Sequence, residues 1–203
     1  MTISIQPVAG SFVAHVSDID IREPLIPEDI ARFVDGMDEF AVLILRNQTV
    51  SDDQQVAFST QFGPIEHAVG SNVTPLEDRR TSTAVADVSN LDRDNRVFDR
   101  EDRRRLFNIG NRLWHSDSSF RPVPARWSLL SARSVVSRGG NTEFADMRAA
   151  YEALPDDAKA EIEDLVCEHS LMHSRGLLGF TEFNEVERAA FKPVRQRLVR
   201  THP

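Results

Sequence analysis

A helical apolar pattern that runs directly into a run of strand-forming residues constrains the fold of this chain most. Over 27–40 the apolar residues recur at the i, i+3, i+4, i+7 spacing of an amphipathic helix, which opens at an early proline. These residues are Ile30, Phe33, Val34 and Met37. Residues 41–45, Ala-Val-Leu-Ile-Leu, follow without a break and favour a buried strand. The sequence therefore predicts a helix packed on a sheet early in the chain.

A capping-box motif starts a second predicted helix. Ser51 is followed three residues later by Gln54, and a Gly-Pro pair at 63–64 ends the helical segment. From about 66 to 112 the periodicity fades, and charged residues of both signs crowd 92–105. A stretch of this length without strong elements predicts a functional lid or mobile loop, with a solvated charged face as the alternative.

The residue pattern in the second half of the chain predicts an antiparallel β core with flanking helices. Strand-like segments lie between Pro and Gly residues at 114–120, 126–132 and 139–144. Helices are predicted at 146–154, 155–167 and 182–191, and a last strand-like segment at 197–200. With 203 residues, the length favours one domain over 1–203, of α+β class with a mainly β core.

Charge and cysteine content exclude several classes of protein. The formal net charge is −8, and an acidic chain repels a phosphate backbone, so we expect no nucleic-acid partner. A lone cysteine, Cys167, excludes an internal disulfide framework and a thiol-built metal cluster. No signal peptide and no apolar run near the ~20 residues of a membrane span are visible. We expect a cytoplasmic protein without a membrane partner.

Residues 114–117, Trp-His-Ser-Asp, carry the most informative chemistry. On a strand, the period of two would place His115 and Asp117 on one face. Non-haem Fe(II) oxygenases hold iron with two histidines and one carboxylate, and the pair would supply two of these three ligands. A His–Asp hydrogen bond that orients a surface strand has the same spacing and remains the alternative.

Other candidate groups carry weaker signals. His169 and His173 are four apart, as two metal ligands on one helical face would be, but the segment lacks the glutamate of a metalloprotease helix. We favour a helix end, where a protonated histidine suits the dipole. Cys167, in the predicted helix 155–167, is interpreted as a small core residue rather than a nucleophile.

Two longer motifs together resemble those of one family. They are Asn-x-x-Trp-His-Ser-Asp-Ser-Ser-Phe at 111–120 and Gly-Gly-Asn-Thr-Glu-Phe-Ala-Asp-Met at 139–147. Both are similar to the TauD/TfdA family of Fe(II)/2-oxoglutarate-dependent dioxygenases, and most similar to its 2,4-dichlorophenoxyacetate (phenoxyalkanoate) branch. The resemblance covers essentially the whole chain. It implies a double-stranded β-helix (jelly roll) with flanking helices, Fe(II) as metal, 2-oxoglutarate as cosubstrate and O2.

The resemblance also implies roles for individual residues. His115 and Asp117 match the first two iron ligands, and no catalytic residue beyond the metal ligands is assigned. Thr142 matches a threonine that hydrogen-bonds the 2-oxoglutarate carboxylate, and Asn111 matches an asparagine near the cosubstrate and substrate. Ser118 would border the substrate pocket.

The resemblance also implies a role for His67, and two further residues of the family site that this sequence does not contain. His67 falls near the position where taurine-type members use a histidine on the substrate anion, with an exposed loop histidine as the alternative. The family's third iron ligand, a distal histidine, and an arginine that pairs with 2-oxoglutarate follow its Arg-Thr-His-Pro segment, here 200–203. We therefore expect the C-terminal part of the jelly-roll core to be missing, and the chain to be a fragment or inactive alone.

The implied reaction is hydroxylation and cleavage of an anionic ether such as 2,4-dichlorophenoxyacetate to a phenol and glyoxylate, with succinate and CO2 formed. A taurine, alkylsulfonate or alkyl-sulfate dioxygenase is the alternative within the family. A non-catalytic β-fold binding module and a cupin-like metalloprotein without 2-oxoglutarate are the alternatives outside it. The expected partner is a small anionic organic molecule, and a homo-oligomer is left open.

Overall fold

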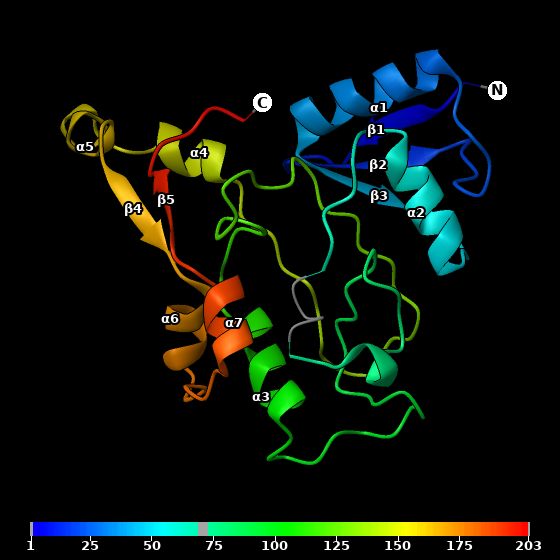
Figure 1. Ribbon diagram of the computed structural model, residues 1–203. Coiled ribbons are helices and arrows are strands. Elements are labelled where there is room, and N and C mark those ends of the chain that lie inside the picture. The colour runs from blue at the N-terminus through cyan, green and yellow to red at the C-terminus, as the bar shows by residue number, and fades with distance from the viewer. Residues whose placement is uncertain (1, 69–72, 203) are drawn as a thin grey trace. The chain divides into compact units, whose positions relative to one another are not determined.

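The computed structural model describes residues 2–68 and 73–202 (Figure 1). Its backbone contacts divide the chain into two compact units, each described here by itself. The first unit contains 1–65 and 129–155, and the second contains 66–128 and 156–203. Within the described ranges, no helix is long and apolar enough to cross a membrane.

The first unit is built on a three-stranded sheet of mixed direction. Its strands are β1 (Ser4–Pro7), β2 (Val13–Ser17) and β3 (Val42–Leu45), in that order. Strand β2 pairs antiparallel with β1 and parallel with β3, because the chain crosses from β2 to β3 through helix α1 (Pro27–Phe40). Figure 1 shows α1 running alongside this sheet. Helices α2 (Asp52–Thr60) and α4 (Met147–Glu152) complete the unit.

The local signals in the first 65 residues are confirmed, except that α2 ends at Thr60, before the Gly-Pro pair at 63–64 that was expected to end it. Helix α1 has the predicted bounds, with a proline in its first turn, and it ends at Ala41, which adopts a left-handed φ of 57°. The predicted strand follows as β3. The capping box is also formed, since Ser51 Oγ accepts from the Gln54 backbone N–H at 3.2 Å and Gln54 Oε1 accepts from the Ser51 N–H at 2.9 Å.

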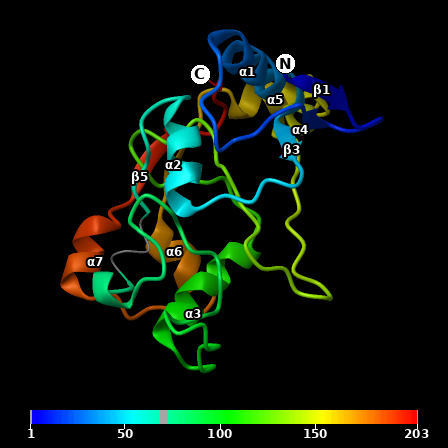
Figure 2. The same ribbon diagram turned by 90° about the vertical axis from the view of Figure 1, so that its right-hand side faces the viewer.

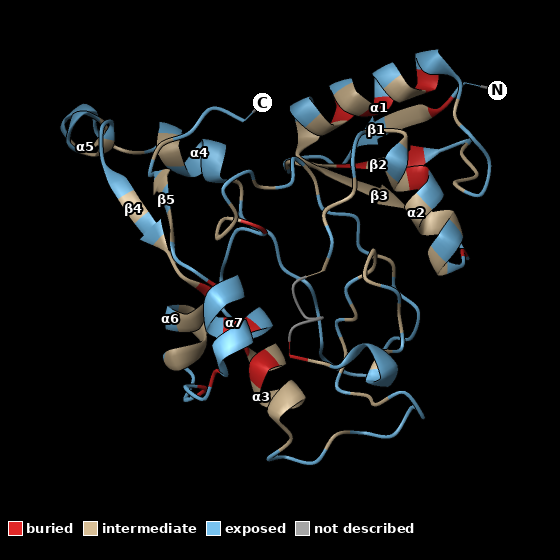
Figure 3. Ribbon diagram, in the orientation of Figure 1, coloured by how far each residue is buried: buried red, intermediate tan, exposed pale blue. Residues whose placement is uncertain are grey.

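An aromatic cluster forms the core between α1, α2 and the sheet. The rings of Phe33 and Phe58 meet edge to face at 5.7 Å, and Phe62 lies 5.2 Å from Phe58. Val16 of β2 and Ile3, which directly precedes β1, are buried in the same cluster. Figure 3 shows buried positions on α1 and α2. Burial of the apolar face of α1 therefore holds the first unit together.

The described residues of the second unit form short helices and one antiparallel pair of strands. Its helical elements are η2 (Leu76–Asp78), α3 (Arg103–Asn108), η3 (Ile109–Arg112), α5 (Asp156–Ile162), α6 (Leu171–Gly176) and α7 (Glu185–Ala190). Strands β4 (Val166–His169) and β5 (Val194–Arg197) pair antiparallel. Figures 1 and 2 both show α3, α6 and α7 gathered together.

A second apolar cluster lies among these helices. The buried members are Val73, Phe107, Leu171, Phe180, Phe183 and Phe191. Beside them Glu187 is fully buried, and its Oε1 accepts from Arg103 Nη1 at 2.8 Å while Oε2 contacts Arg103 Nη2. This ion pair ties α3 to α7.

The strands predicted at 114–120, 126–132 and 139–144 are wrong for this structure. The described residues from 113 to 146 form turns, bends and extended segments without ladder pairing. Ser118, Gly139 and Gly140 have φ of 59°, 74° and 71°, which breaks the continuous extended backbone that a ladder needs. The coarser expectation of an α+β chain with sheets and flanking helices is confirmed.

Several predicted bounds in the last third are also corrected. The helix predicted at 155–167 ends at Ile162, and Cys167 lies on β4 opposite Gln196, because β5 offers a pairing partner. The last strand is Val194–Arg197 rather than 197–200, and α7 is shorter than 182–191 because Asn184 caps it. His169 lies on β4 and His173 on α6, so these two histidines do not share one helical face.

Among its described residues, the segment 66–112 carries η2, α3 and η3 as regular elements, in agreement with the weak periodicity of its sequence. Its interpretation as a lid or mobile loop stays a prediction. Residues 69–72 of this segment lie outside the described residues.

Candidate metal centre

The His115 ring is held in one orientation by a backbone carbonyl two residues earlier in the chain. Its Nδ1 lies 2.6 Å from the carbonyl oxygen of Leu113. A carbonyl oxygen can only accept, so Nδ1 carries the hydrogen, and in this tautomer Nε2 is the nitrogen with a free lone pair. A backbone carbonyl that fixes the tautomer in this way is typical of metal-binding histidines.

Asp117 faces this nitrogen with one oxygen and is fixed through the other. Asp117 Oδ1 lies 3.2 Å from His115 Nε2, and Oδ2 accepts a 2.6 Å hydrogen bond from Ser128 Oγ. With Nδ1 protonated, Nε2 and Oδ1 both present lone pairs and would repel each other. A metal ion bound by both atoms would remove this repulsion.

The distance between His115 Nε2 and Asp117 Oδ1 suits two ligands of one metal ion. Two ligand atoms at roughly 2.1 Å from one metal and at a right angle are separated by about 3 Å, close to the observed 3.2 Å. The side chains are 46% and 58% exposed, which leaves this side of the pair open to further ligands. Within residues 2–68 and 73–202, no group of three or more His, Cys, Asp or Glu could hold a metal ion.

Ser118 follows the pair and turns inward. Its φ of 59° makes a sharp corner after Asp117, and its buried hydroxyl donates to Glu66 Oε1 at 3.0 Å. The Arg121 N–H closes this turn on the Ser118 carbonyl at 2.8 Å. Ser118 therefore anchors the turn that presents Asp117, and its place at a substrate pocket stays a prediction.

His67 is brought to the same turn through Arg121. Arg121 Nη2 donates to the His67 carbonyl at 2.9 Å, and Arg121 Nε lies 3.5 Å from Glu66 Oε1. The imidazole itself is exposed, with Nδ1 3.2 Å from Thr83 Oγ1. The structure thus brings the two predicted substrate residues, His67 and Ser118, into one hydrogen-bonded network.

The two predicted cosubstrate residues lie in different units. Asn111 is exposed on η3, and its Oδ1 accepts from Arg175 Nη2 at 3.3 Å. Thr142 is an exposed residue of the first unit, whereas Asn111 and the His115 pair belong to the second. Their roles toward 2-oxoglutarate stay predictions.

Sequence reasoning missed three residues of this neighbourhood: Ser128, Glu66 and Arg175. Each touches a predicted site residue that is distant in the sequence, because Ser128 reaches Asp117, Glu66 reaches Ser118 and Arg175 reaches Asn111. No spacing pattern marks such contacts, and only the fold could reveal them.

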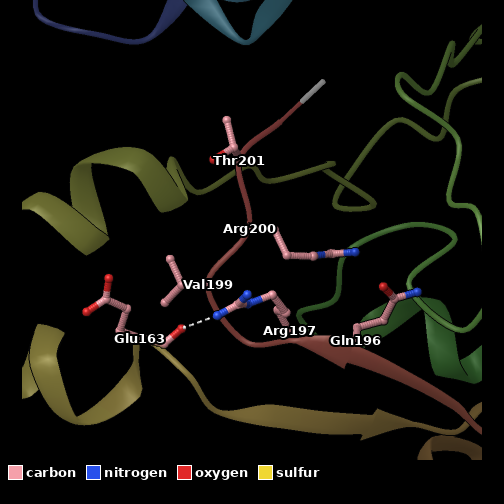
Figure 4. Close-up of a pocket in the computed structure, with 6 residues that line it drawn as sticks. All are labelled: Glu163, Gln196, Arg197, Val199, Arg200 and Thr201. Carbon is pink, nitrogen blue, oxygen red and sulfur yellow. Dashed lines mark hydrogen bonds between the residues drawn. The ribbon is translucent and has the colours of Figure 1, made fainter.

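An open pocket elsewhere in the second unit contains none of the predicted site residues. It is lined by Glu163, Gln196, Arg197, Val199, Arg200 and Thr201 (Figure 4). Arg197 reaches across to the Glu163 carbonyl at 3.5 Å and pairs with Asp164 at 2.6 Å. Its charge is therefore already matched.

Comparison with known proteins identifies the class of enzyme and then the family. A curated 2,4-dichlorophenoxyacetate dioxygenase of Cupriavidus pinatubonensis, named as alpha-ketoglutarate-dependent, is 45% identical over 202 residues. A (S)-phenoxypropionate/alpha-ketoglutarate-dioxygenase of Sphingobium herbicidovorans is 38% identical over 180 residues. The first alignment covers 100% of this chain and 70% of the relative, and the second covers 86% and 56%.

A solved structure agrees with these relatives. The crystal structure of AAD-2 in complex with Mn(II) and N-oxalylglycine matches with a TM-score of 0.93 and 57% identity, over 100% of this chain and 70% of that one. The family model described as "Taurine catabolism dioxygenase TauD, TfdA family" matches residues 4–203. The chain belongs to the TauD/TfdA family, which confirms the resemblance seen in the sequence.

Proposed function

We propose that the protein is an Fe(II)- and 2-oxoglutarate-dependent dioxygenase that hydroxylates and cleaves an anionic aryl ether such as 2,4-dichlorophenoxyacetate. The observation that carries the proposal is the convergence of His115 Nε2 and Asp117 Oδ1, 3.2 Å apart, in a chain of this family. Relatives named for phenoxyalkanoate substrates support the substrate class. The proposal includes the family's jelly-roll core as the fold of the whole enzyme.

The chemistry divides between the iron and the protein. When bound, Fe(II) couples decarboxylation of 2-oxoglutarate by O2, which gives succinate and CO2, to hydroxylation of the substrate carbon beside the ether oxygen. The hydroxylated product is a hemiacetal, which separates into a phenol and glyoxylate. The residues of the chain bind the metal, orient both organic acids and keep the reacting C–H bond in place.

His115 and Asp117 perform the metal-binding part. The Leu113 carbonyl holds the His115 ring so that Nε2 is the ligand atom, and Ser128 holds Asp117 so that Oδ1 is the ligand atom. Fixed ligands lower the entropy lost on metal binding. Their half-exposed side would leave room for further ligands of the metal, such as the carboxylate of 2-oxoglutarate.

The remaining assignments follow the family motifs. Thr142 and Asn111 orient 2-oxoglutarate, and Ser118 and His67 lie at the substrate side. We also propose a reducing, cytoplasmic setting, because Cys167 is a free cysteine. A small anionic organic substrate is the proposed partner.

The test measures both organic products. The complete enzyme that contains this chain is incubated with Fe(II), 2-oxoglutarate, O2 and 2,4-dichlorophenoxyacetate, and 2,4-dichlorophenol and succinate are quantified, with taurine as a parallel substrate. We expect the two products in equal amounts, and neither from the His115→Ala variant. Succinate formation that responds to taurine and not to the phenoxyacetate would overturn the substrate class. Equal activity of His115→Ala would overturn the metal site.

A further inference from the structure

Arg175, on α6, is a largely enclosed cation without an anionic partner. Among the residues that the structure describes, no carboxylate pairs with it, and its polar contacts are a 3.3 Å hydrogen bond to Asn111 Oδ1 and a 3.5 Å one to Ser174 Oγ. Its Nε is buried and has no hydrogen-bond partner. Burial lowers the pKa of the Arg175 guanidinium, because no neighbouring charge offsets the loss of hydration.

Other arginines of the second unit show the contrast. Arg103 contacts both oxygens of Glu187, and Arg104 donates to both oxygens of Asp102. Arginine forms such forked contacts with carboxylates by preference. The guanidinium of Arg175 instead meets the neutral side-chain amide of Asn111 and solvent.

The cradle around Arg175 is shaped for the guanidinium. Its Cζ lies 4.9 Å from the centre of the Phe107 ring, which supports a cation over an aromatic face. On another side is Gly110, where any Cβ would overlap the guanidinium. A glycine at this position gives the charged group the space it fills. The guanidinium is thus fixed between an aromatic ring and bare backbone.

Burying a charge that lacks a counter-ion costs stability, and folded proteins tolerate that cost mainly where function needs it. The buried edge of the group is Nε, whereas Nη2 meets Asn111 at the exposed side of η3. An anion can therefore reach the guanidinium at Asn111. A carboxylate bound there would supply further hydrogen-bond acceptors and the counter-charge that no described residue provides for the Arg175 guanidinium.

The cradle connects directly to the metal centre. The Leu113 N–H donates to the Gly110 carbonyl at 3.2 Å, and the Leu113 carbonyl accepts from His115 Nδ1 at 2.6 Å. Gly110 packs against the Arg175 guanidinium, so two hydrogen bonds through the Leu113 backbone connect the Arg175 site to His115, the proposed metal ligand. We propose that Arg175 binds the carboxylate of an organic acid that the metal centre uses, an inference that rests on the proposed function.

The test compares charged and neutral ligands of one shape. Phenoxyacetate and its neutral counterpart 2-phenoxyethanol are titrated into the metal-free protein by isothermal calorimetry or ligand-observed NMR. A second series uses 2-oxoglutarate, because substrate and cosubstrate both carry carboxylates. The variants are Arg175→Gln and Gly110→Ala, and the matched control is Arg195→Gln, an exposed arginine of β5 in the same unit.

Gly110→Ala leaves Arg175 in the sequence but displaces its guanidinium, and it requires no unusual backbone conformation because Gly110 does not have a positive φ. It keeps the inference testable if Arg175→Gln does not fold. Circular dichroism checks the fold of each variant.

Wild type is expected to prefer phenoxyacetate over phenoxyethanol, and both variants to lose about tenfold to a hundredfold of carboxylate affinity while binding the alcohol unchanged. Loss in the phenoxyacetate series assigns Arg175 to the substrate, and loss in the 2-oxoglutarate series assigns it to the cosubstrate. Full carboxylate preference in folded Arg175→Gln, or no carboxylate binding by wild type, would overturn the inference.

Failure of the proposed function gives a different result. If Arg175 controls carboxylate affinity but wild type forms no phenol or succinate, the carboxylate site stands and the reaction is wrong. If wild type forms both products and Arg175→Gln binds every ligand normally, the reaction stands and the role of Arg175 is wrong.

Discussion

The hydroxyl of Ser128 donates a 2.6 Å hydrogen bond to Oδ2 of Asp117, eleven residues earlier in the chain. This contact leaves Oδ1 directed at His115 Nε2. A group that orients a ligand in this way typically contributes tenfold to a hundredfold to metal affinity. Ser128 is therefore expected to matter to metal binding at the proposed site, although it is not itself one of the proposed ligands.

Ser128→Ala is predicted to weaken Mn(II) binding about tenfold to a hundredfold, because Asp117 loses the hydrogen bond that holds its carboxylate. Titration of the bound metal by electron paramagnetic resonance measures the affinity. The control is Ser116→Ala, which removes an exposed hydroxyl next to His115. Equal Mn(II) affinity in Ser128→Ala and Ser116→Ala would contradict the prediction.

The buried ion pair between α3 and α7 gives a prediction for stability. Glu187 is fully buried and contacts Arg103 with both oxygens, whereas Arg103 keeps 39% of its side-chain surface exposed. Glu187→Gln removes the charge with little change of shape and leaves the guanidinium against a neutral amide. We expect the free energy of unfolding to fall by about 2–3 kcal/mol, below the usual loss for a fully buried pair because Arg103 retains hydration.

Urea denaturation measures this loss, and Glu185→Gln is the matched control on the same helix. Glu185 is exposed, so its substitution should change the free energy of unfolding by less than about 0.5 kcal/mol. Equal effects of the two substitutions would show that the ion pair does not stabilise the second unit.

Asp102 gives a prediction for pH dependence. It caps α3 by accepting from the Arg104 N–H at 2.8 Å, and the side-chain hydrogen bonds from the Arg104 guanidinium lower the pKa of its carboxyl group. A folded-state pKa below the unfolded value of about 3.9 means that the stabilisation is complete above this value. It is lost as the pH falls through the lower, folded value.

Asp102→Asn keeps a capping side chain but cannot ionise. The stability difference between wild type and Asp102→Asn should therefore be largest at pH 5 to 7 and should shrink below about pH 4. Thermal melts followed by circular dichroism at several pH values measure it, with the exposed Asp99→Asn as control. A difference that is constant from pH 7 to pH 3 would contradict the prediction.

The sequence predicted what depends on neighbours along the chain. Helix α1 and the Ser51 capping box appear with the expected bounds, because the apolar spacing and the hydrogen bonds that define them lie within a few residues. The approach of His115 to Asp117 was also predicted, since a single residue separates them, and their role as metal ligands stays a prediction. The strand expected over 114–120 was wrong, however, because a turn occupies 117–120 and Ser118 has a φ of 59°.

What depends on distant partners was not predictable. Cys167 was placed in a helix, and it lies on β4 because residues near 196 provide a pairing strand. Arg175 and Asn111 are 64 residues apart, and no local motif indicates their contact. Strand pairing and unpaired buried charges are properties of the folded chain, so they require the structure.

The aromatic core of the first unit gives the last prediction. Phe58 is 2% exposed, and its ring packs edge to face on Phe33 at 5.7 Å and near Phe62 at 5.2 Å. Phe58→Ala would remove this ring from the centre of the cluster and leave a cavity, so the free energy of unfolding should fall by about 3–5 kcal/mol. Phe144→Ala is the matched control, because Phe144 belongs to the same unit and is 56% exposed. Urea denaturation followed by circular dichroism compares the two variants, and equal midpoints would show that the Phe58 cluster is not the core that holds α1 and α2 to the sheet.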